Sequence, residues 1–505
     1  MVIMIIGINS RGAKWTWTEK ENVKVDLPTY KCIPPKYLNG SRSRTRTLMS
    51  LVQISRQTSQ CILRGSVWAV STSVGTTGTD QQYRNMSSKI KMADRLKGTE
   101  RNVWVEFGKL SAEYKAINLG QGFPDYHPPQ HVCEKFSKVV IDPDTPLTHQ
   151  YTRSYGQPHL VNTLAKLYSP ILKRDINAMN EVMISVGAFG VLFSSIQGLV
   201  NPGDEVIIIE PYFDCYEPMV RVAGGTPVFI PLRPKKTEGV VTSNDWVLDK
   251  DELASKFNSK TKAIIFNNPN NPVGKVYKQD ELEMVADLCK KYDVACIADE
   301  VYEWMIYENN KHIKIATLPG MWERTITIGS AGKTFSATGW KLGWGIGPEN
   351  LIEALKVLHQ NSIYTCPTPI QETVASGLDY ELSVFGDNEK CYLQSLALEL
   401  IPKRDMLAKV LTEVGITPTI PEGGYFMMCD ISKLDVEIPD DGTDDPYDFK
   451  FVRWMTKNKK VSAIPPTAFY SAEHKKLGEN YIRFCFFKMD ETLEKAAKVF
   501  REWKA

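Results

Sequence analysis

Two lysines in one short stretch are the residues of this sequence best placed to do chemistry. Lys333 follows an apolar segment (residues 325–329), and the small residues at 330–332 let a bulky group approach the backbone there. Lys341 follows eight residues later. A buried amine that loses its proton easily can form a Schiff base with a carbonyl group. A strand end and turn with two solvated lysines would have the same local sequence, so residues elsewhere must decide.

An acidic residue ends a predicted buried strand. Asp299 follows the apolar run 294–298. A carboxylate at the carboxyl edge of an α/β sheet lies where ligands bind, and it can pair with a protonated ring nitrogen and keep it charged. Because Glu300-Val-Tyr-Glu follows, Asp299 could instead cap a helix, and both interpretations stay open.

A loop rich in turn-forming residues follows the apolar run 263–266. Residues 267–275 read Asn-Asn-Pro-Asn-Asn-Pro-Val-Gly-Lys. A plain connection needs one or two such residues, not two Asn-Pro pairs and a glycine. Asn271 can present its amide to a phenolic oxygen, so this loop predicts a binding function.

A Gly-x-x-Gly turn is predicted to join a strand (182–186) to an apolar helix (191–200). Backbone N–H groups at a helix start can hold a phosphate. The turn alone is weak evidence, but Ser330 and Lys341 could add a hydroxyl and an ammonium group.

Arg483 is a lone guanidinium in the apolar run 481–487. Burying it unpaired is costly, so we expect a bidentate anionic ligand, with an internal salt bridge as the alternative. A reactive lysine, a carboxylate for a ring nitrogen, a phosphate site and this arginine together indicate pyridoxal phosphate acting on amino acids.

Alternating strands and helices must position these residues. Apolar runs separated by helical segments recur from residue 182 to 346, which predicts an α/β fold with a mostly parallel sheet. After residue 391 a long helix (396–414) and two strand-like segments predict a smaller α+β domain. We therefore predict four parts, namely a leader (1–98), an N-terminal arm that starts the small domain (99–131), a large cofactor-binding domain (132–395) and a small C-terminal domain (396–505).

Composition excludes several classes of protein. Among 505 residues the net charge is +2, which gives no reason to expect a nucleic-acid partner. The ten cysteines show no CxxC or Cys/His spacing, so we expect neither a metal site nor a disulfide framework. No apolar run reaches the roughly 18 residues of a membrane span.

The first part of the chain differs in composition. From Leu27 to Thr79 there is no Asp or Glu, and five arginines lie between residues 40 and 79. Such composition is typical of organellar transit peptides, so we predict a cytoplasmic and/or mitochondrial enzyme. Met49 and Met86 offer two further starts, and a disordered leader without a targeting role is the alternative.

Residues from about 102 to 505 resemble fold-type I pyridoxal-phosphate aminotransferases, and within them the group of kynurenine aminotransferases, glutamine transaminases K and cysteine-conjugate β-lyases. The segments that carry the resemblance are 118–125, 210–218, 267–275, 299–304 and 330–344. The resemblance implies a seven-stranded-type sheet domain, a smaller α+β domain, and a homodimer with shared active sites.

The resemblance also implies a role for each matching residue. Lys333 would bind the cofactor covalently and act as the catalytic base. The other cofactor-binding residues would be Asp299, Tyr302, Asn271, Phe213, Ala188, Phe189, Ser330, Lys341 and Tyr151 of the partner subunit. The substrate-binding residues would be Arg483, Asn271, Gly122, Trp104 and Tyr364.

Two departures from the family pattern bear on specificity. Ala188-Phe189 stands where many relatives have Gly-Tyr, and Tyr364-Thr365 stands where some have Phe-His. We predict transfer of the amino group of L-kynurenine, glutamine or other aromatic or sulfur amino acids to a 2-oxo acid, with β-lyase side activity. The alternatives are another aromatic or alanine-type aminotransferase, or a non-catalytic protein that binds pyridoxal phosphate.

Overall fold

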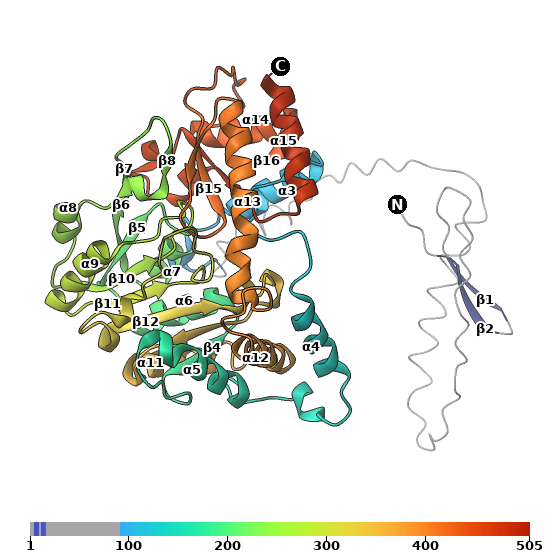
Figure 1. Cartoon of the computed structure of the whole chain (residues 1–505), viewed down its shortest axis with the longest axis vertical. Coiled ribbons are helices and arrows are strands. Elements are labelled where there is room, and N and C mark those ends of the chain that lie inside the picture. The colour runs from blue at the N-terminus through green and yellow to red at the C-terminus, as the bar shows by residue number, and fades with distance from the viewer. Residues whose placement is uncertain (1–4, 10–11, 17–90, 505) are drawn as a thin grey trace, which may run out of the picture. The chain divides into compact units, whose positions relative to one another are not determined.

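The computed structural model describes residues 5–9, 12–16 and 91–504 (Figure 1). The chain divides into two units, residues 1–89 and 90–505. The described part of the first unit is an antiparallel hairpin of β1 (Ile5–Asn9) and β2 (Gly12–Thr16). The rest of the predicted leader up to residue 90 lies outside the described residues.

A seven-stranded sheet forms the centre of the second unit, in the order β4-β13-β12-β11-β10-β5-β6. Only β13 runs antiparallel to its neighbours, so the prediction of a mostly parallel α/β sheet is confirmed. Its strands are β4 (Val182–Ser185), β5 (Glu205–Glu210), β6 (Thr226–Pro231), β10 (Thr261–Asn267), β11 (Ala295–Asp299), β12 (Thr325–Ser330) and β13 (Gly343–Ile346).

Helices cover both faces of this sheet, which explains its short, continuously apolar strands. Neighbouring residues of one strand pack on opposite sides. Ile208 joins the core beneath α6 (Gly187–Leu199) and α11 (Glu349–Ser362), whereas Ile207 joins the core beneath α9 (Gln279–Tyr292). The helices around the sheet are α4 (Gln130–Ile141), α5 (Pro158–Leu172), α6 (Gly187–Leu199), α7 (Tyr216–Val222), α8 (Lys250–Ser255), α9 (Gln279–Tyr292), α10 (Ala331–Thr334), α11 (Glu349–Ser362) and α12 (Thr368–Ser383).

Helix α6 begins earlier than predicted. The sequence suggested a turn up to residue 190 and a helix from 191, but the helix starts at Gly187. Gly187 has a φ of +70°, a backbone conformation that glycine adopts without strain, so the chain can leave β4 and enter the helix within two residues. Ala188 and Phe189 therefore lie in the first helical turn.

The smaller domain packs around a four-stranded sheet in the order β17-β15-β14-β8. Figure 1 shows its helices α13, α14 and α15 gathered beside α3. Its elements are α13 (Tyr392–Glu413), β14 (Thr417–Ile420), β15 (Phe426–Asp430), α14 (Tyr447–Asn458), β16 (Val461–Ser462), β17 (Tyr481–Cys485) and α15 (Asp490–Lys504).

Two other parts of the chain join this smaller domain. Helix α3 (Val103–Glu113) packs on α14, and β3 (Ile117–Asn118) pairs with β16. The edge strand β8 (Val241–Thr242) pairs with β14 although it comes from within the predicted large domain, where β7 (Arg233–Pro234) and β9 (Trp246–Val247) form a separate ribbon. Strand β8 therefore belongs, by its pairing, to the sheet of the smaller domain.

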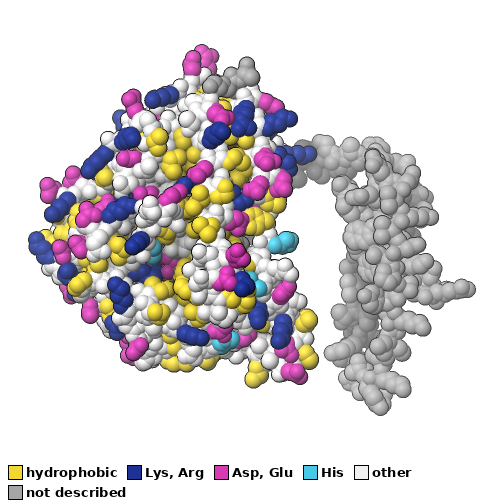
Figure 2. Space-filling model, in the orientation of Figure 1, with side chains coloured by type: hydrophobic (Ala, Val, Ile, Leu, Met, Phe, Trp, Pro, Cys, Tyr) yellow, Lys and Arg dark blue, Asp and Glu magenta, His cyan; other side chains and the backbone are white. Residues whose placement is uncertain are grey.

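The surface carries both signs of charge. On the face that Figure 2 draws, Lys and Arg side chains are interspersed with Asp and Glu. None of the helices that the structure describes is both long and apolar enough to cross a membrane.

A buried ionic network lies beside the end of β11. The Lys314 ammonium group contacts Glu300 at 2.6 Å and Glu303 at 2.7 Å, and Tyr168 donates a hydrogen bond to Glu303. Burial alone would raise the pKa of Glu300, but Lys314 and His312 hold it at about 2. The network therefore fixes the segment that follows Asp299.

Replacing Lys314 with methionine should lower the free energy of unfolding by about 3–5 kcal/mol, because two carboxylates would stay buried without their cation. Denaturant-induced unfolding measures this cost. The control is K290M, which removes an exposed pair with Asp287 and should leave the transition unchanged. Equal stability of K314M and the parent protein would contradict the assignment.

Candidate active site

A cavity of about 310 Å³ lies at the carboxyl ends of the parallel strands. Strands β10, β11 and β12 end there with Asn267, Asp299 and Ser330, which is where open α/β sheets bind ligands. The cavity brings together most of the predicted site residues, namely Trp104, Gly122, Ala188, Phe189, Phe213, Asn271, Asp299, Tyr302, Ser330, Lys333, Lys341 and Arg483. Tyr151 and Tyr364 do not line it.

Lys333 extends into the cavity from α10, directly after β12. Its amine donates a hydrogen bond to the Tyr425 hydroxyl and lies 5.6 Å from the centre of the Tyr302 ring. Burial, together with the positive charges of Arg483 and Lys341, lowers the pKa of Lys333 to about 8. The amine is therefore much closer to its neutral, nucleophilic form at physiological pH than an ordinary lysine.

Asp299 has one satisfied oxygen and one free oxygen. Its Oδ2 accepts a 2.6 Å hydrogen bond from Tyr216, whereas its buried Oδ1 has no partner among the described residues. Burial raises the pKa of Asp299 to about 6. Turns rather than a helix follow at residues 301–304, so the helix-cap alternative is wrong. The free oxygen is suited to a positively charged N–H donor.

The first turn of α6 presents backbone N–H groups to the cavity. A Cβ atom added at Gly187 would lie 3.6 Å from the Lys341 ammonium, so this cation lies over the helix start. Gly343 of β13 packs so closely that its Cβ would lie 2.4 Å from the nitrogen of Ala188. Helix dipole, ammonium group and the nearby Ser330 hydroxyl form a site for an anion such as a phosphate.

The asparagine-rich loop is held in shape by its own side chains. The Asn271 N–H donates to the side chain of Asn267 at 2.7 Å, and the Val273 N–H donates to that of Asn270 at 3.1 Å. These side-chain acceptors satisfy two backbone N–H groups within the loop. The loop thereby places the Asn271 amide in the cavity.

Arg483 is fully buried on β17 and has no ion-pair partner among the described residues. Its guanidinium donates to Asn271 Oδ1 at 3.0 Å and to the Gly120 carbonyl at 2.8 Å, while its Nε is unpaired. Burial lowers the pKa of Arg483 to about 10. The predicted alternative of an internal salt bridge is therefore wrong, and the arginine is available to an external carboxylate.

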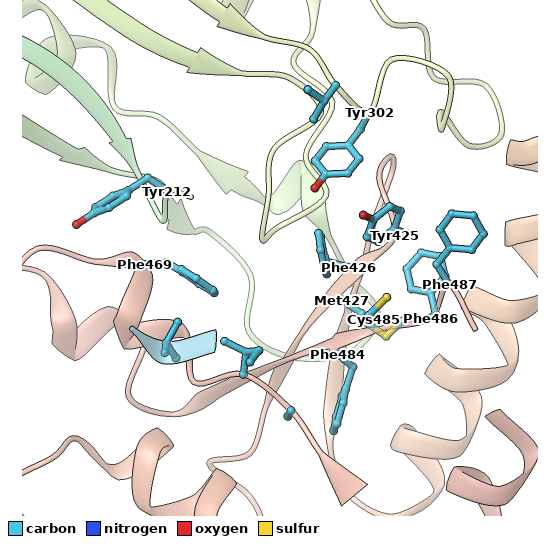
Figure 3. Packing of buried hydrophobic residues seen from close by; sticks show 14 of the residues in the cluster. Tyr212, Tyr302, Tyr425, Phe426, Met427, Phe469, Phe484, Cys485, Phe486 and Phe487 are labelled. Atoms are coloured by element: carbon cyan, nitrogen blue, oxygen red, sulfur yellow. The ribbon is translucent and has the colours of Figure 1, made fainter. Parts of the chain in front are cut away.

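Aromatic rings surround this guanidinium. Its central carbon lies 3.9 Å from the Phe426 ring, 5.1 Å from Trp104 and 5.2 Å from Phe469. Figure 3 shows Phe426 close to Tyr425 and Tyr302, with Phe469 further to the left in the view. Gly122 completes the wall, since a Cβ there would lie 2.4 Å from Phe426.

Sequence reasoning missed several residues of this site. Tyr216, Tyr425 and Phe426 contact Asp299, Lys333 and Arg483, respectively. Tyr216 belongs to the motif 210–218, and the other two begin a strand-like segment, so each had a sequence signal. None of them stood out because a tyrosine or phenylalanine in an apolar run is usually core.

Tyr151 and Tyr364 lie together outside the cavity. Their ring centres are 5.8 Å apart in a T-shaped arrangement, and 83% of Tyr151 and 53% of Tyr364 are exposed. Phe189, at the start of α6, is also 48% exposed. The roles of Tyr151 and Tyr364 require a second subunit and stay predictions.

The family model for aminotransferases of class I and II matches residues 114–500. The chain belongs to this family. It is 54% identical to mouse kynurenine--oxoglutarate transaminase 3 over 83% of this chain and 92% of the relative. It is 48% identical to human kynurenine--oxoglutarate transaminase 1 over 83% of this chain and 99% of the relative. The predictions of fold-type I architecture and of transaminase activity are confirmed.

Solved structures agree with this assignment of the aminotransferase. Bna3p of Saccharomyces cerevisiae, described as a proposed kynurenine aminotransferase, is 35% identical with a TM-score of 0.76, covering 82% of this chain and 99% of its own. N-Succinyldiaminopimelate aminotransferase of Mycobacterium tuberculosis is 32% identical with a TM-score of 0.72, covering 81% and 99%. One scaffold thus serves different amino donors, and the pocket walls must decide between them.

The Lys333 amine should react with small aldehydes at lower pH than other lysines of the aminotransferase. Reductive methylation of the cofactor-free protein with formaldehyde, followed by mass spectrometry, should give a rate that rises with pH and reaches half its plateau near pH 8, the pKa of Lys333. The sign follows because only the unprotonated amine attacks the aldehyde. A midpoint near the ordinary lysine value of about 10.4 would contradict the lowered pKa.

Proposed function

We propose that this aminotransferase binds pyridoxal phosphate in the cavity at the strand ends. The observation that carries the proposal is the buried Asp299 Oδ1 without a partner, because a protonated pyridine nitrogen would satisfy it. The start of α6, with Lys341 and Ser330, fits the phosphate group. Lys333 fits the covalent attachment, and Phe213 lies where it can pack against a ring.

The bound cofactor supplies a sink for the electron pair that remains when the substrate Cα loses its proton. Asp299 would keep the ring nitrogen protonated, since an adjacent carboxylate favours the charged form of the ring N–H and raises its pKa. The Lys333 amine, neutral in an accessible pH range, takes the Cα proton as a general base. Arg483 and Asn271 hold the substrate carboxylate, which fixes the Cα–H bond toward Lys333.

We propose that the amino donor is L-kynurenine, with glutamine and other aromatic or sulfur amino acids as further donors and kynurenic acid as the product of kynurenine. The names of the relatives support this choice. The aromatic rings around Arg483 also favour it, because they place a large apolar surface next to the carboxylate site. A donor with a leaving group at Cβ would give β-lyase side activity from the same proton removal.

Purified protein supplied with pyridoxal phosphate, L-kynurenine and 2-oxoglutarate should release kynurenic acid. K333A should lose turnover by several orders of magnitude, because nucleophile and base are removed together. The control is K262A, an exposed lysine on β10, which should keep full activity. Kynurenine turnover below that of alanine would favour the alanine-type alternative, and near-normal turnover of K333A would contradict the proposed mechanism.

We also propose a homodimer whose active sites are shared. The support is the exposed Tyr151–Tyr364 pair and the half-exposed Phe189 of the cavity lining, which offer apolar surface to a second subunit. Sedimentation should show a dimer. Mixing inactive K333A with impaired Y151A should restore part of the activity, because a hybrid dimer contains one complete site. A fully active monomer, or no recovery on mixing, would contradict the shared site.

The proposal that the enzyme acts in mitochondria rests on the leader composition alone. A product that starts at Met86 retains Trp104, Gly122 and all later site residues, so it should be equally active in the cytosol. Sequencing the amino terminus of protein from separated mitochondria and cytosol tests the leader, and an untrimmed chain found in cytosol alone would contradict targeting.

A further inference from the structure

A carboxylate bonded to the lining residue Trp104 has no role in the chemistry described above. Asp214 follows Phe213 in the segment between β5 and α7. Its Oδ2 accepts a 2.8 Å hydrogen bond from the indole N–H of Trp104, a residue 110 positions earlier in the chain. The bond thus joins helix α3, which packs on the smaller domain, to the loop that follows β5 of the seven-stranded sheet.

The backbone of Trp104 is fixed separately from its ring. The side chain of Asn102 caps α3 and accepts hydrogen bonds from the N–H groups of Trp104 and Val105 at 3.0 and 3.1 Å. This cap sets where the helix begins but not how the indole is rotated. Since the indole has one polar atom, its bond to Asp214 is the polar contact that can select a rotamer.

The selected rotamer places the indole in the substrate side-chain space. The ring lies 5.1 Å from the Arg483 guanidinium carbon, and its centre lies 6.3 Å from that of Phe213 and 6.0 Å from that of Phe469. The indole is therefore a part of the cavity wall that adjoins Arg483. A small rotation would move an aromatic surface that a large donor side chain must touch.

The surroundings of Asp214 act on its charge in two opposite directions. Burial raises the pKa of Asp214, while the Trp104 N–H and the nearby Arg483 charge act in the opposite direction by favouring the carboxylate. A hydrogen bond to an ionised acceptor is stronger than one between neutral groups. Asp214 contacts no other side chain of the cavity by a hydrogen bond in the described part of the chain.

We propose that Asp214 is a positioning residue that sets the amino-donor preference by holding the Trp104 indole against the substrate side-chain space. The proposal rests on the proposed function only in that the donors are amino acids. Removing the bond should lower kcat/KM for donors whose side chains contact the indole. It should leave kcat/KM nearly unchanged for donors too small to reach the indole.

The kinetic test compares phenylalanine with alanine as donors to the same 2-oxo acid. D214A should lower kcat/KM for phenylalanine about tenfold, mainly through KM, and that for alanine less than about twofold. D214N should recover most of the preference, because the amide oxygen still accepts the indole proton. The control is E217A. Glu217 lies three residues after Asp214, but its carboxylate accepts a hydrogen bond from the Tyr212 hydroxyl and not from Trp104.

A double-variant cycle separates positioning of the indole from a general structural role. W104F keeps an aromatic ring and removes the N–H donor, so adding D214A to W104F should cost less than about twofold more with phenylalanine. Multiplicative losses in the double variant, or equal losses for the two donors in D214A, would overturn the proposal.

A binding measurement on the holoenzyme does not depend on turnover. Calorimetry should show that D214A weakens binding of 3-phenylpropanoate several-fold more than binding of propanoate. D214N should bind both ligands about as tightly as the parent protein does. Unchanged 3-phenylpropanoate binding would overturn the role of Asp214. Absence of transamination in the parent protein would count against the proposed function alone, because this binding ratio would still be measurable.

Discussion

A carboxylate with one free oxygen, buried at the end of the central strand β11, is the constraint on which the site depends. Asp299 lies beside Asn267 in the register of β10 and β11, and beside Ile328 in that of β11 and β12. Burying such a group costs free energy unless a donor or cation meets it. Tyr216 donates to one oxygen, whereas the second oxygen has no hydrogen-bond partner in the described part of the chain, and Asp299 lines the cavity. A ligand with a cationic N–H group that binds this oxygen therefore offsets the free energy that burial of the carboxylate costs.

Burial also changes the pKa values of the cationic side chains near Asp299. Lys333 and Arg483 lie in the same cavity, and burial lowers the pKa of each, to about 8 and about 10, respectively. A site with one carboxylate and several cations attracts a ligand with a phosphate and a carboxylate. Helix α6 adds the partial positive charge of its first turn. The cavity thus combines the reactive amine of Lys333 with two anion sites, one at the start of α6 and one at Arg483.

The sequence predicted those parts of the site in which a polar residue interrupts an apolar run. Lys333, Asp299 and Arg483 were recognisable because such residues are rarely buried without a function. Asp214 and Tyr425 were missed because their partners lie 110 and 92 positions away, and no local pattern encodes such contacts. For the same reason the two-residue strand β8, which joins the sheet of the smaller domain, could not be predicted.

The state of the cofactor ring nitrogen tests the central claim most directly. Nitrogen-15 NMR of the protein reconstituted with ring-labelled pyridoxal phosphate should show a protonated nitrogen near pH 7.5. In D299N the signal should shift to that of a neutral pyridine, because the carboxylate that stabilises the cation is gone. A neutral nitrogen in the parent protein, or the same protonated signal in D299N, would contradict the role assigned to the free oxygen of Asp299.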